Sequence, residues 1–170
     1  MKIYTKTGDD GTTYLRGARI FKSSPWIEVQ GDLDELNAWI GMARSSHGST
    51  DLKQIQDILL EIGAELATGR TRVISDDIER LEKSIDTMSL DLPPLKNFIL
   101  PAGGVDAAPI HVARAVCRRL ERNLVTLMER EDMADFGLVI PYINRLSDYL
   151  FVLARKVRGW DETWTSRIDK

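Results

Sequence analysis

Cysteine and histidine are scarce in this sequence. Its one cysteine, Cys117, cannot form an internal disulfide, and its two histidines, His47 and His111, have no further ligands at metal-binding spacing. This scarcity excludes a zinc site and a disulfide-stapled fold. We expect Cys117 to pack in the core, which suits a reducing compartment, and the histidines to be hydrogen-bonded or solvated.

Long apolar runs and targeting segments are also missing. No stretch approaches the roughly 20 apolar residues that span a membrane, and the opening MKIY leads straight into a glycine-rich segment. The net charge of -3 excludes a generally basic protein that coats nucleic acid. We therefore expect a cytoplasmic protein with neither a nucleic acid nor a membrane as partner.

The usual signatures of catalytic machinery are absent as well. Segment 5–13 lacks the G-x-x-x-x-G-K-[ST] pattern, no strand precedes it in a βαβ unit, and the chain shows no Ser-His-Asp set. These absences weaken kinase and GTPase interpretations. They favour a reaction whose nucleophile arrives with a ligand.

Apolar residues at spacings of three and four are abundant and predict five amphipathic helices. The predicted ranges are 32–45, 51–68, 75–88, 108–131 and 141–158. Asp32 and Glu35 fit a capping box at the first start, and brief strands are expected around 3–4 and 27–29. The pattern predicts an all-α fold with short connections.

We expect a single domain that covers residues 1–170. Residues 1–30 would form an ordered loop segment, 31–158 the helical bundle and 159–170 a tail. Trp160 and Trp164 in the tail either pack late against the bundle or form a flap over an apolar ligand.

The helix predicted over 108–131 carries a cluster of arginines. At about 100° per residue, Arg114, Arg118 and Glu121 fall in a sector about 60° wide beside the apolar stripe, with Arg122 next to it. Arg114 with Arg118, and Arg118 with Arg122, are like-charge pairs that destabilise a helix. Either an anionic ligand compensates them, or Glu121 and other acidic residues neutralise them on an ordinary surface.

The segment TKTGDDGTT at residues 5–13 gathers glycines, hydroxyls and a lysine. A turn-rich loop of this kind can aim backbone N–H groups at phosphate oxygens. Lys22 follows Arg16 and Arg19 in a stretch that could fold back over the loop. The sequence therefore predicts a phosphate site near the N-terminus.

Five motifs together are similar to a known family: TKTGDDGTT, GDLDELNAWIG, FILPAGG, RAVCRRLER and NRLSDYLF, in this order. They resemble the PduO-type ATP:cob(I)alamin adenosyltransferases over nearly the whole chain. The resemblance implies a ferritin-like five-helix bundle with an ordered N-terminal loop for ATP. It also implies transfer of the 5′-deoxyadenosyl group from ATP to the cobalt of reduced cob(I)alamin, with release of triphosphate.

The same resemblance implies partners and site residues. It implies a homotrimer with ATP between subunits, Mg²⁺ held through the ATP phosphates, and a possible reductase that supplies electrons. Phe98 matches the phenylalanine that presses against the corrin ring, and Asp34 and Arg114 match positions that pair across the subunit interface; with Arg118 they are the catalytic candidates. The implied ATP-binding residues are Thr5, Lys6, Thr7, Gly8, Thr12, Thr13, Lys22, Arg118, Arg119, Leu120, Glu121, Arg122 and Asn144.

Two departures and two alternatives accompany this interpretation. Asp10 stands where many relatives have lysine, and Trp26 where arginine is common, so nucleotide binding could be weaker. The chain could instead be an ATP-binding regulatory bundle without corrin chemistry, or a helical protein whose arginines bind an acidic partner. Phe98 and Asp34 argue against the regulator, and the loop at 5–13 argues against the interaction protein.

Overall fold

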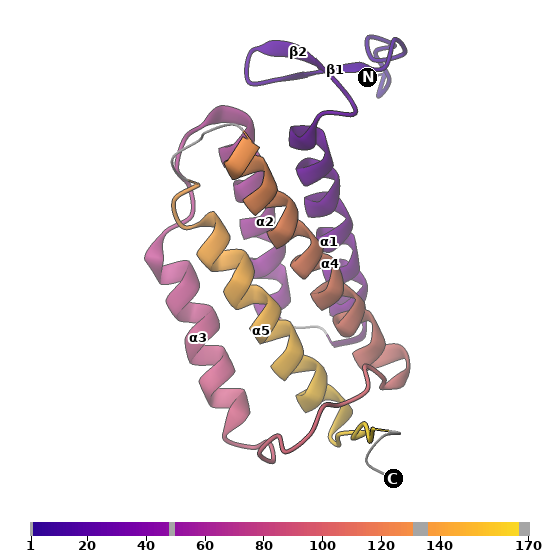
Figure 1. Ribbon diagram of the computed structural model, residues 1–170, viewed down its shortest axis with the longest axis vertical. Helices are drawn as coiled ribbons and strands as arrows, with labels where there is room; N and C mark the ends of the chain where they lie inside the picture. The colour runs from indigo at the N-terminus through magenta and orange to yellow at the C-terminus, as the bar shows by residue number, and fades with distance from the viewer. Residues whose placement is uncertain (1, 48–49, 131–135, 167–170) are drawn as a thin grey trace.

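The computed structural model describes residues 2–47, 50–130 and 136–166. Within these residues lie five helices and a hairpin: α1 (Pro25–His47), α2 (Thr50–Thr68), α3 (Ser75–Ser89), α4 (Gly104–Arg130), α5 (Val139–Arg158), β1 (Thr12–Leu15) and β2 (Ala18–Phe21). The helices form an elongated bundle, with the hairpin beyond one end and the C-terminal tail at the other (Figure 1). The predicted five-helix bundle is confirmed.

Helix α4 lies at the centre of the bundle. It packs against α1 and α5, while α2 packs on α1 and α3 packs on α5. The apolar stripes predicted from the sequence meet in this core, where Leu36, Ile143 and Leu120 are fully buried. Cys117 is buried as expected, and its thiol donates to the Ile143 carbonyl oxygen at 3.2 Å.

The prediction that His111 is hydrogen-bonded or solvated is wrong for one nitrogen of its ring. The side chain is buried, and its Nδ1 has no hydrogen-bond partner in the part of the chain that the structure describes. Burial lowers the pKa of His111, and the charges of Arg114 and Arg158 lower it further. Burial and the two neighbouring charges therefore favour the neutral form of the ring.

The predicted start of α1 is wrong. The helix begins at Pro25, because proline suits a first turn and because the buried Trp26 and Val29 extend the apolar stripe toward the N-terminus. Residues 27–29 are therefore helical and form no strand. Asp32 is no cap, since its buried carboxylate accepts from Arg119 Nε and Asn123 Nδ2, both at 2.7 Å.

The other helix boundaries shift less. Helix α4 begins at Gly104, so that Pro109 lies inside it, and α5 begins at Val139. The predicted helix end at 131 and the middle of the predicted turn at 47–50 lie outside the described residues. Helix α5 ends as expected, because Gly159 adopts a left-handed φ of 78° and donates to the Arg155 carbonyl oxygen.

The brief strands occur at 12–15 and 18–21, and residues 3–4 form none. Arg16 and Gly17 both have positive φ, as a tight hairpin turn requires. The Arg16 guanidinium lies 4.6 Å from the centroid of the Trp26 ring, and that ring meets Phe136 edge to face. Trp26 thus anchors the hairpin turn to the bundle.

Candidate functional site

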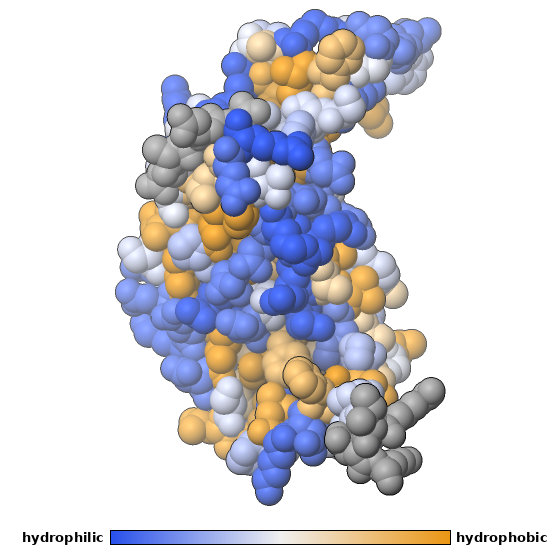
Figure 2. Space-filling view, viewed as in Figure 1, coloured by the Kyte–Doolittle hydropathy of each residue, from blue (hydrophilic) through white to orange (hydrophobic). Residues whose placement is uncertain are grey.

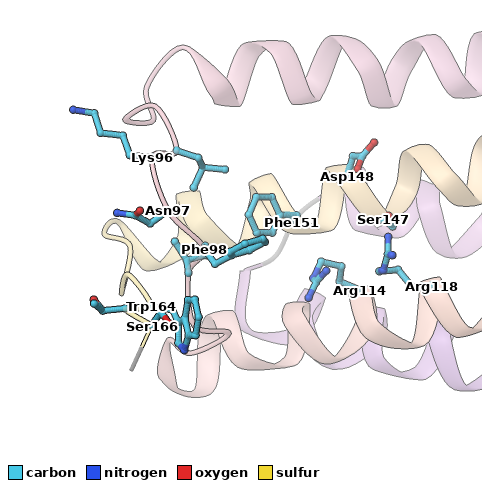
Figure 3. A pocket seen from close by; sticks show the side chains of 13 residues that line it. Lys96, Asn97, Phe98, Arg114, Arg118, Ser147, Asp148, Phe151, Trp164 and Ser166 are labelled. Carbon is cyan, nitrogen blue, oxygen red and sulfur yellow. The ribbon is translucent and has the colours of Figure 1, made fainter. Parts of the chain in front are cut away.

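A pocket of about 920 Å³ opens at the end of the bundle away from the hairpin. Three parts of the chain line it: the segment between α3 and α4, the facing sides of α4 and α5, and the C-terminal tail (Figure 3). Its lining residues are Leu95, Lys96, Asn97, Phe98, Ile99, Arg114, Arg118, Ser147, Asp148, Phe151, Trp164, Thr165 and Ser166.

One side of this pocket is apolar. Phe98 is 82% exposed, an unusual state for a phenylalanine, and it lines the pocket together with Phe151 and Trp164. Hydrophobic side chains also gather at this end of the molecule, below a hydrophilic band over the middle of the same face (Figure 2). The exposed rings offer a flat apolar ligand a contact surface.

The opposite side of the pocket is cationic. Arg114 and Arg118 reach from α4 toward α5 (Figure 3), and neither forms an ion pair within the described residues. The Nε of Arg114 is buried without a hydrogen-bond partner there, and burial, with the charge of Arg118, lowers the pKa of this guanidinium. An anion in the pocket would satisfy both side chains.

Glu121 bonds to Asn144 of α5 rather than to these arginines. Its Oε1 accepts from Asn144 Nδ2 at 2.7 Å, and it forms no ion pair in the described ranges. The Nη1 of Arg122 donates to the backbone oxygen of Arg118 at 2.9 Å. The ordinary-surface alternative for the arginine cluster is therefore unsupported.

Two of the predicted ATP-binding residues, Arg119 and Leu120, do not line the pocket. Arg119 pairs with Asp32 and Glu35 of α1, and the hydrogen bonds that its guanidinium donates to these carboxylates raise its pKa. Leu120 is fully buried in the core. Within one chain, these two side chains support the helix that carries the arginine cluster.

Residues 5–13, the predicted phosphate loop, accept hydrogen bonds from Arg19 and Lys22 of the same chain. Lys22 Nζ donates to the Gly8 carbonyl oxygen at 2.8 Å, and Arg19 donates to the Thr7 carbonyl oxygen at 2.6 Å. Asp10 pairs with Arg19 at 3.1 Å and accepts from the backbone and hydroxyl of Thr12, which lowers the pKa of its carboxyl. The carboxylate of Asp10 thus holds a cation of its own chain.

The remaining loop residues are exposed or half-buried near the hairpin. Thr5 and Thr7 share a hydrogen bond at 2.8 Å, Lys6 has a positive φ of 62°, and Thr13 lies in β1. The hydrogen bonds described for residues 5–13 all stay within residues 5–22. One chain therefore does not bring the loop against Arg118.

Asp34 and Arg114 do not meet within one chain either. Asp34 is exposed on α1 and forms no ion pair in the described part of the structure, while Arg114 is half-buried beside Phe151, 5.8 Å from its ring centroid. The structure brings together Phe98, Arg114 and Arg118 of the predicted catalytic residues. It leaves Asp34 apart from them.

Several lining residues were not predicted as site residues. The sequence does place Asp148 and Phe151 on one flank of α5 with Asn144 at helical spacing, and a flank of this kind can face the arginines of the preceding helix. The contribution of the tail at 164–166 had no comparable signal beyond the tryptophans. No group of three or more acidic, histidine or cysteine side chains that could hold a metal occurs among the described residues.

None of the described helices is long and apolar enough to cross a membrane.

Comparison with known proteins gives a consistent match. The model of the cobalamin adenosyltransferase family matches residues 3–157. A corrinoid adenosyltransferase from Bacillus subtilis is 40% identical, over 94% of this chain and 88% of its own length. One from Mus musculus is also 40% identical, over 91% of this chain and 71% of its own.

Solved structures agree in fold. A variant PduO-type ATP:co(I)rrinoid adenosyltransferase from Lactobacillus reuteri, complexed with ATP, superposes with a TM-score of 0.88 at 36% identity, covering 96% of this chain and all of its own. Another variant of the PduO-type enzyme from that organism, complexed with cobalamin and ATP, has a TM-score of 0.86 at 34% identity, covering 98% and 97%.

Proposed function

The chain belongs to the cobalamin adenosyltransferase family, and we propose that it transfers the 5′-deoxyadenosyl group from ATP to the cobalt of reduced cob(I)alamin. The products are adenosylcobalamin and triphosphate. The observation that carries the proposal is the pocket in which the exposed ring of Phe98 faces two arginines that form no ion pair within the described residues. A flat apolar substrate and a polyanion could share such a site.

The substrate and the protein contribute different parts of the proposed reaction. The reduced corrinoid supplies the nucleophile, which displaces triphosphate from the 5′ carbon of ATP. The protein then needs to orient the two substrates and stabilise the charge that develops on the leaving group. Arg118 and Arg122 suit bidentate contacts with triphosphate oxygens, and Lys6 and Lys22 suit point-charge contacts.

We propose that the active form is a homotrimer with ATP between subunits. The loop at 5–13 and the arginines of α4 lie apart in one chain, so a neighbouring subunit would have to supply one of them. Mg²⁺ would bind through the ATP phosphates and water, which is its usual mode of binding.

Two further features of the proposal follow from the chemistry of the substrate. Cob(I)alamin forms by reduction, so a reductase that supplies electrons is a partner. A reducing compartment keeps that substrate available, which is why we propose a cytoplasmic location.

One experiment separates this proposal from an ATP-binding regulator without corrin chemistry. The protein is mixed with Mg-ATP and chemically reduced cobalamin, and the absorption spectrum is followed. We expect the spectrum of the cobalt–carbon product to grow only when protein and ATP are both present. ATP binding without any product would favour the regulator.

Phe98→Ala is expected to slow adenosylation from cob(II)alamin by about tenfold or more, with little change in ATP affinity. A large apolar side chain under the corrin excludes the lower axial ligand without offering another, and the cobalt(II) corrinoid then becomes easier to reduce. Kinetics and the four-coordinate cob(II)alamin spectrum measure this effect. Leu90→Ala, at an exposed apolar position in the turn after α3, is the control. A lost ATP affinity with an intact four-coordinate spectrum would make Phe98 a purely structural residue.

Lys22→Ala is expected to raise the KM for ATP by about tenfold with a smaller change in kcat. The substitution removes a cation from the loop and its hydrogen bond to the Gly8 carbonyl. Steady-state kinetics with varied ATP measures the effect. Lys53→Ala, which breaks an exposed pair with Asp57 on α2, should leave KM unchanged. An equally unchanged KM for Lys22→Ala would remove Lys22 from the site.

A further inference from the structure

Phe98 lies on a segment that has little structure of its own. We call this connection between α3 and α4, residues 90–103, the Phe98 segment. It contains Pro93, Pro94 and Pro101, which disfavour regular helix. The ring of Phe98 is 82% exposed, so packing of the side chain does little to fix it. Its position in the pocket therefore depends on how the backbone of residues 98–100 is held.

The C-terminal tail holds that backbone. The Leu100 N–H donates to the Glu162 carbonyl oxygen at 2.8 Å, and the Trp164 N–H donates to the Phe98 carbonyl oxygen at 2.7 Å. Between these bonds, Ile99 and Thr163 form an antiparallel bridge. The tail thus pairs with the Phe98 segment as a short second strand.

One buried arginine ties both segments to α5. Arg155 is 7% exposed, and its Nη2 donates to Asp161 Oδ2 and to the Pro93 carbonyl oxygen, both at 2.7 Å. Its Nε donates to the other carboxylate oxygen of Asp161 at 3.0 Å. The guanidinium therefore bonds to the tail and to the Phe98 segment at once.

The charge state of this pair is fixed under ordinary conditions. The hydrogen bonds and the charge of Arg155 hold the pKa of Asp161 below its usual range, with a further contribution from Arg158. An arginine stays protonated at all working pH values. Removing the Asp161 charge would leave the Arg155 guanidinium buried without its ion partner, which is costly.

We propose that Arg155 and Asp161 are positioning residues that fix Phe98 at the pocket by clamping the C-terminal tail to the Phe98 segment. Neither residue lines the pocket, so both act through the backbone of residues 98–100. The proposal rests on the proposed function, because it concerns the placement of the ring that faces the corrinoid. A pre-organised ring spares the substrate the cost of ordering the segment on binding.

The test compares Asp161→Asn with the wild type. We expect kcat from cob(II)alamin to fall by about tenfold and the four-coordinate cob(II)alamin signal to weaken to the same degree, while KM for ATP stays the same. The amides of Leu100 and Trp164 should exchange with deuterium faster. Asp91→Asn, which breaks the exposed Lys156–Asp91 pair at the same end of α5, is the matched control and should change none of these.

Two outcomes would overturn the proposal. The first is a folded Asp161→Asn protein with an unchanged four-coordinate signal and unchanged exchange at Leu100 and Trp164. The second is an unchanged signal in Arg155→Lys, which keeps the charge but cannot reach Asp161 and the Pro93 carbonyl together; we expect about a threefold loss. Arg155→Lys decides the matter if Asp161→Asn fails to fold.

The same experiment keeps the two proposals distinct. A wild-type protein that forms no product from chemically reduced cobalamin and Mg-ATP would contradict the proposed function, whatever the variants do. Wild-type activity together with an unaffected Asp161→Asn protein would contradict the clamp alone.

Discussion

Arg118→Ala is expected to lower kcat by about 10²-fold or more while the protein stays folded. The guanidinium lines the pocket, is exposed, and forms no ion pair within the described residues, so the fold does not depend on it. A substitution at such a position changes the free energy of unfolding by only about 0.5 kcal/mol. The lost activity would reflect the contact with the triphosphate leaving group.

Steady-state kinetics with pre-reduced cob(I)alamin and a thermal melt measure the two effects separately. Arg118→Lys keeps the charge without the planar fork and should recover only part of the activity. Arg72→Ala is the control, because it removes an arginine whose ion pair with Glu61 lies on the exposed surface of α2. A folded Arg118→Ala protein with near-normal turnover would refute the phosphate role.

The sequence predicted the helices well where local pattern and burial agree. Helix α2 was expected at 51–68 and lies at Thr50–Thr68, since its apolar residues keep an unbroken helical period. Helix α1 was misjudged because Pro25 suggests a loop and Asp32 with Glu35 fits a capping box, whereas the buried Trp26 extends the helix toward the N-terminus. A proline in a first turn is compatible with either interpretation until the core is known.

Tertiary partners explain the other differences. Asp32 fitted a capping box by local spacing, but its carboxylate accepts from Arg119 and Asn123, far along the chain. No local pattern carries that information. The same holds for Arg155 and Asp161, whose importance rests on their common contact with the segment before α4.

The arginine cluster was predictable for a specific reason. Like charges four residues apart destabilise a helix, so their repetition from Arg114 to Arg122 signalled a compensating anion. The sequence could not decide whether an anionic ligand or Glu121 compensates the arginines, because helical spacing places Glu121 within reach of them. The structure shows that Glu121 accepts from Asn144 and forms no ion pair with these arginines within the described residues.

Asp34 and Arg114 are the pair whose disruption we expect to affect both the assembly and the site. Asp34 has no ion partner in the described part of one chain, and Arg114 carries a buried Nε without a hydrogen bond. A neighbouring subunit that brings Asp34 to Arg114 would satisfy both. Removing one partner from a buried pair costs about 3–5 kcal/mol, because the other charge stays behind unpaired.

Asp34→Asn and Arg114→Ala should therefore each weaken cobalamin binding by about 10²-fold or dissociate the proposed trimer. The charge reversals Asp34→Arg and Arg114→Asp, each disruptive alone, should together recover part of the loss. A double-mutant cycle measures this coupling in cobalamin affinity and in mass by light scattering. Asp57→Asn, on the exposed face of α2, is the control for a lost carboxylate. Strict additivity in both measurements would mean that the two side chains do not meet, since only residues in contact share an interaction energy.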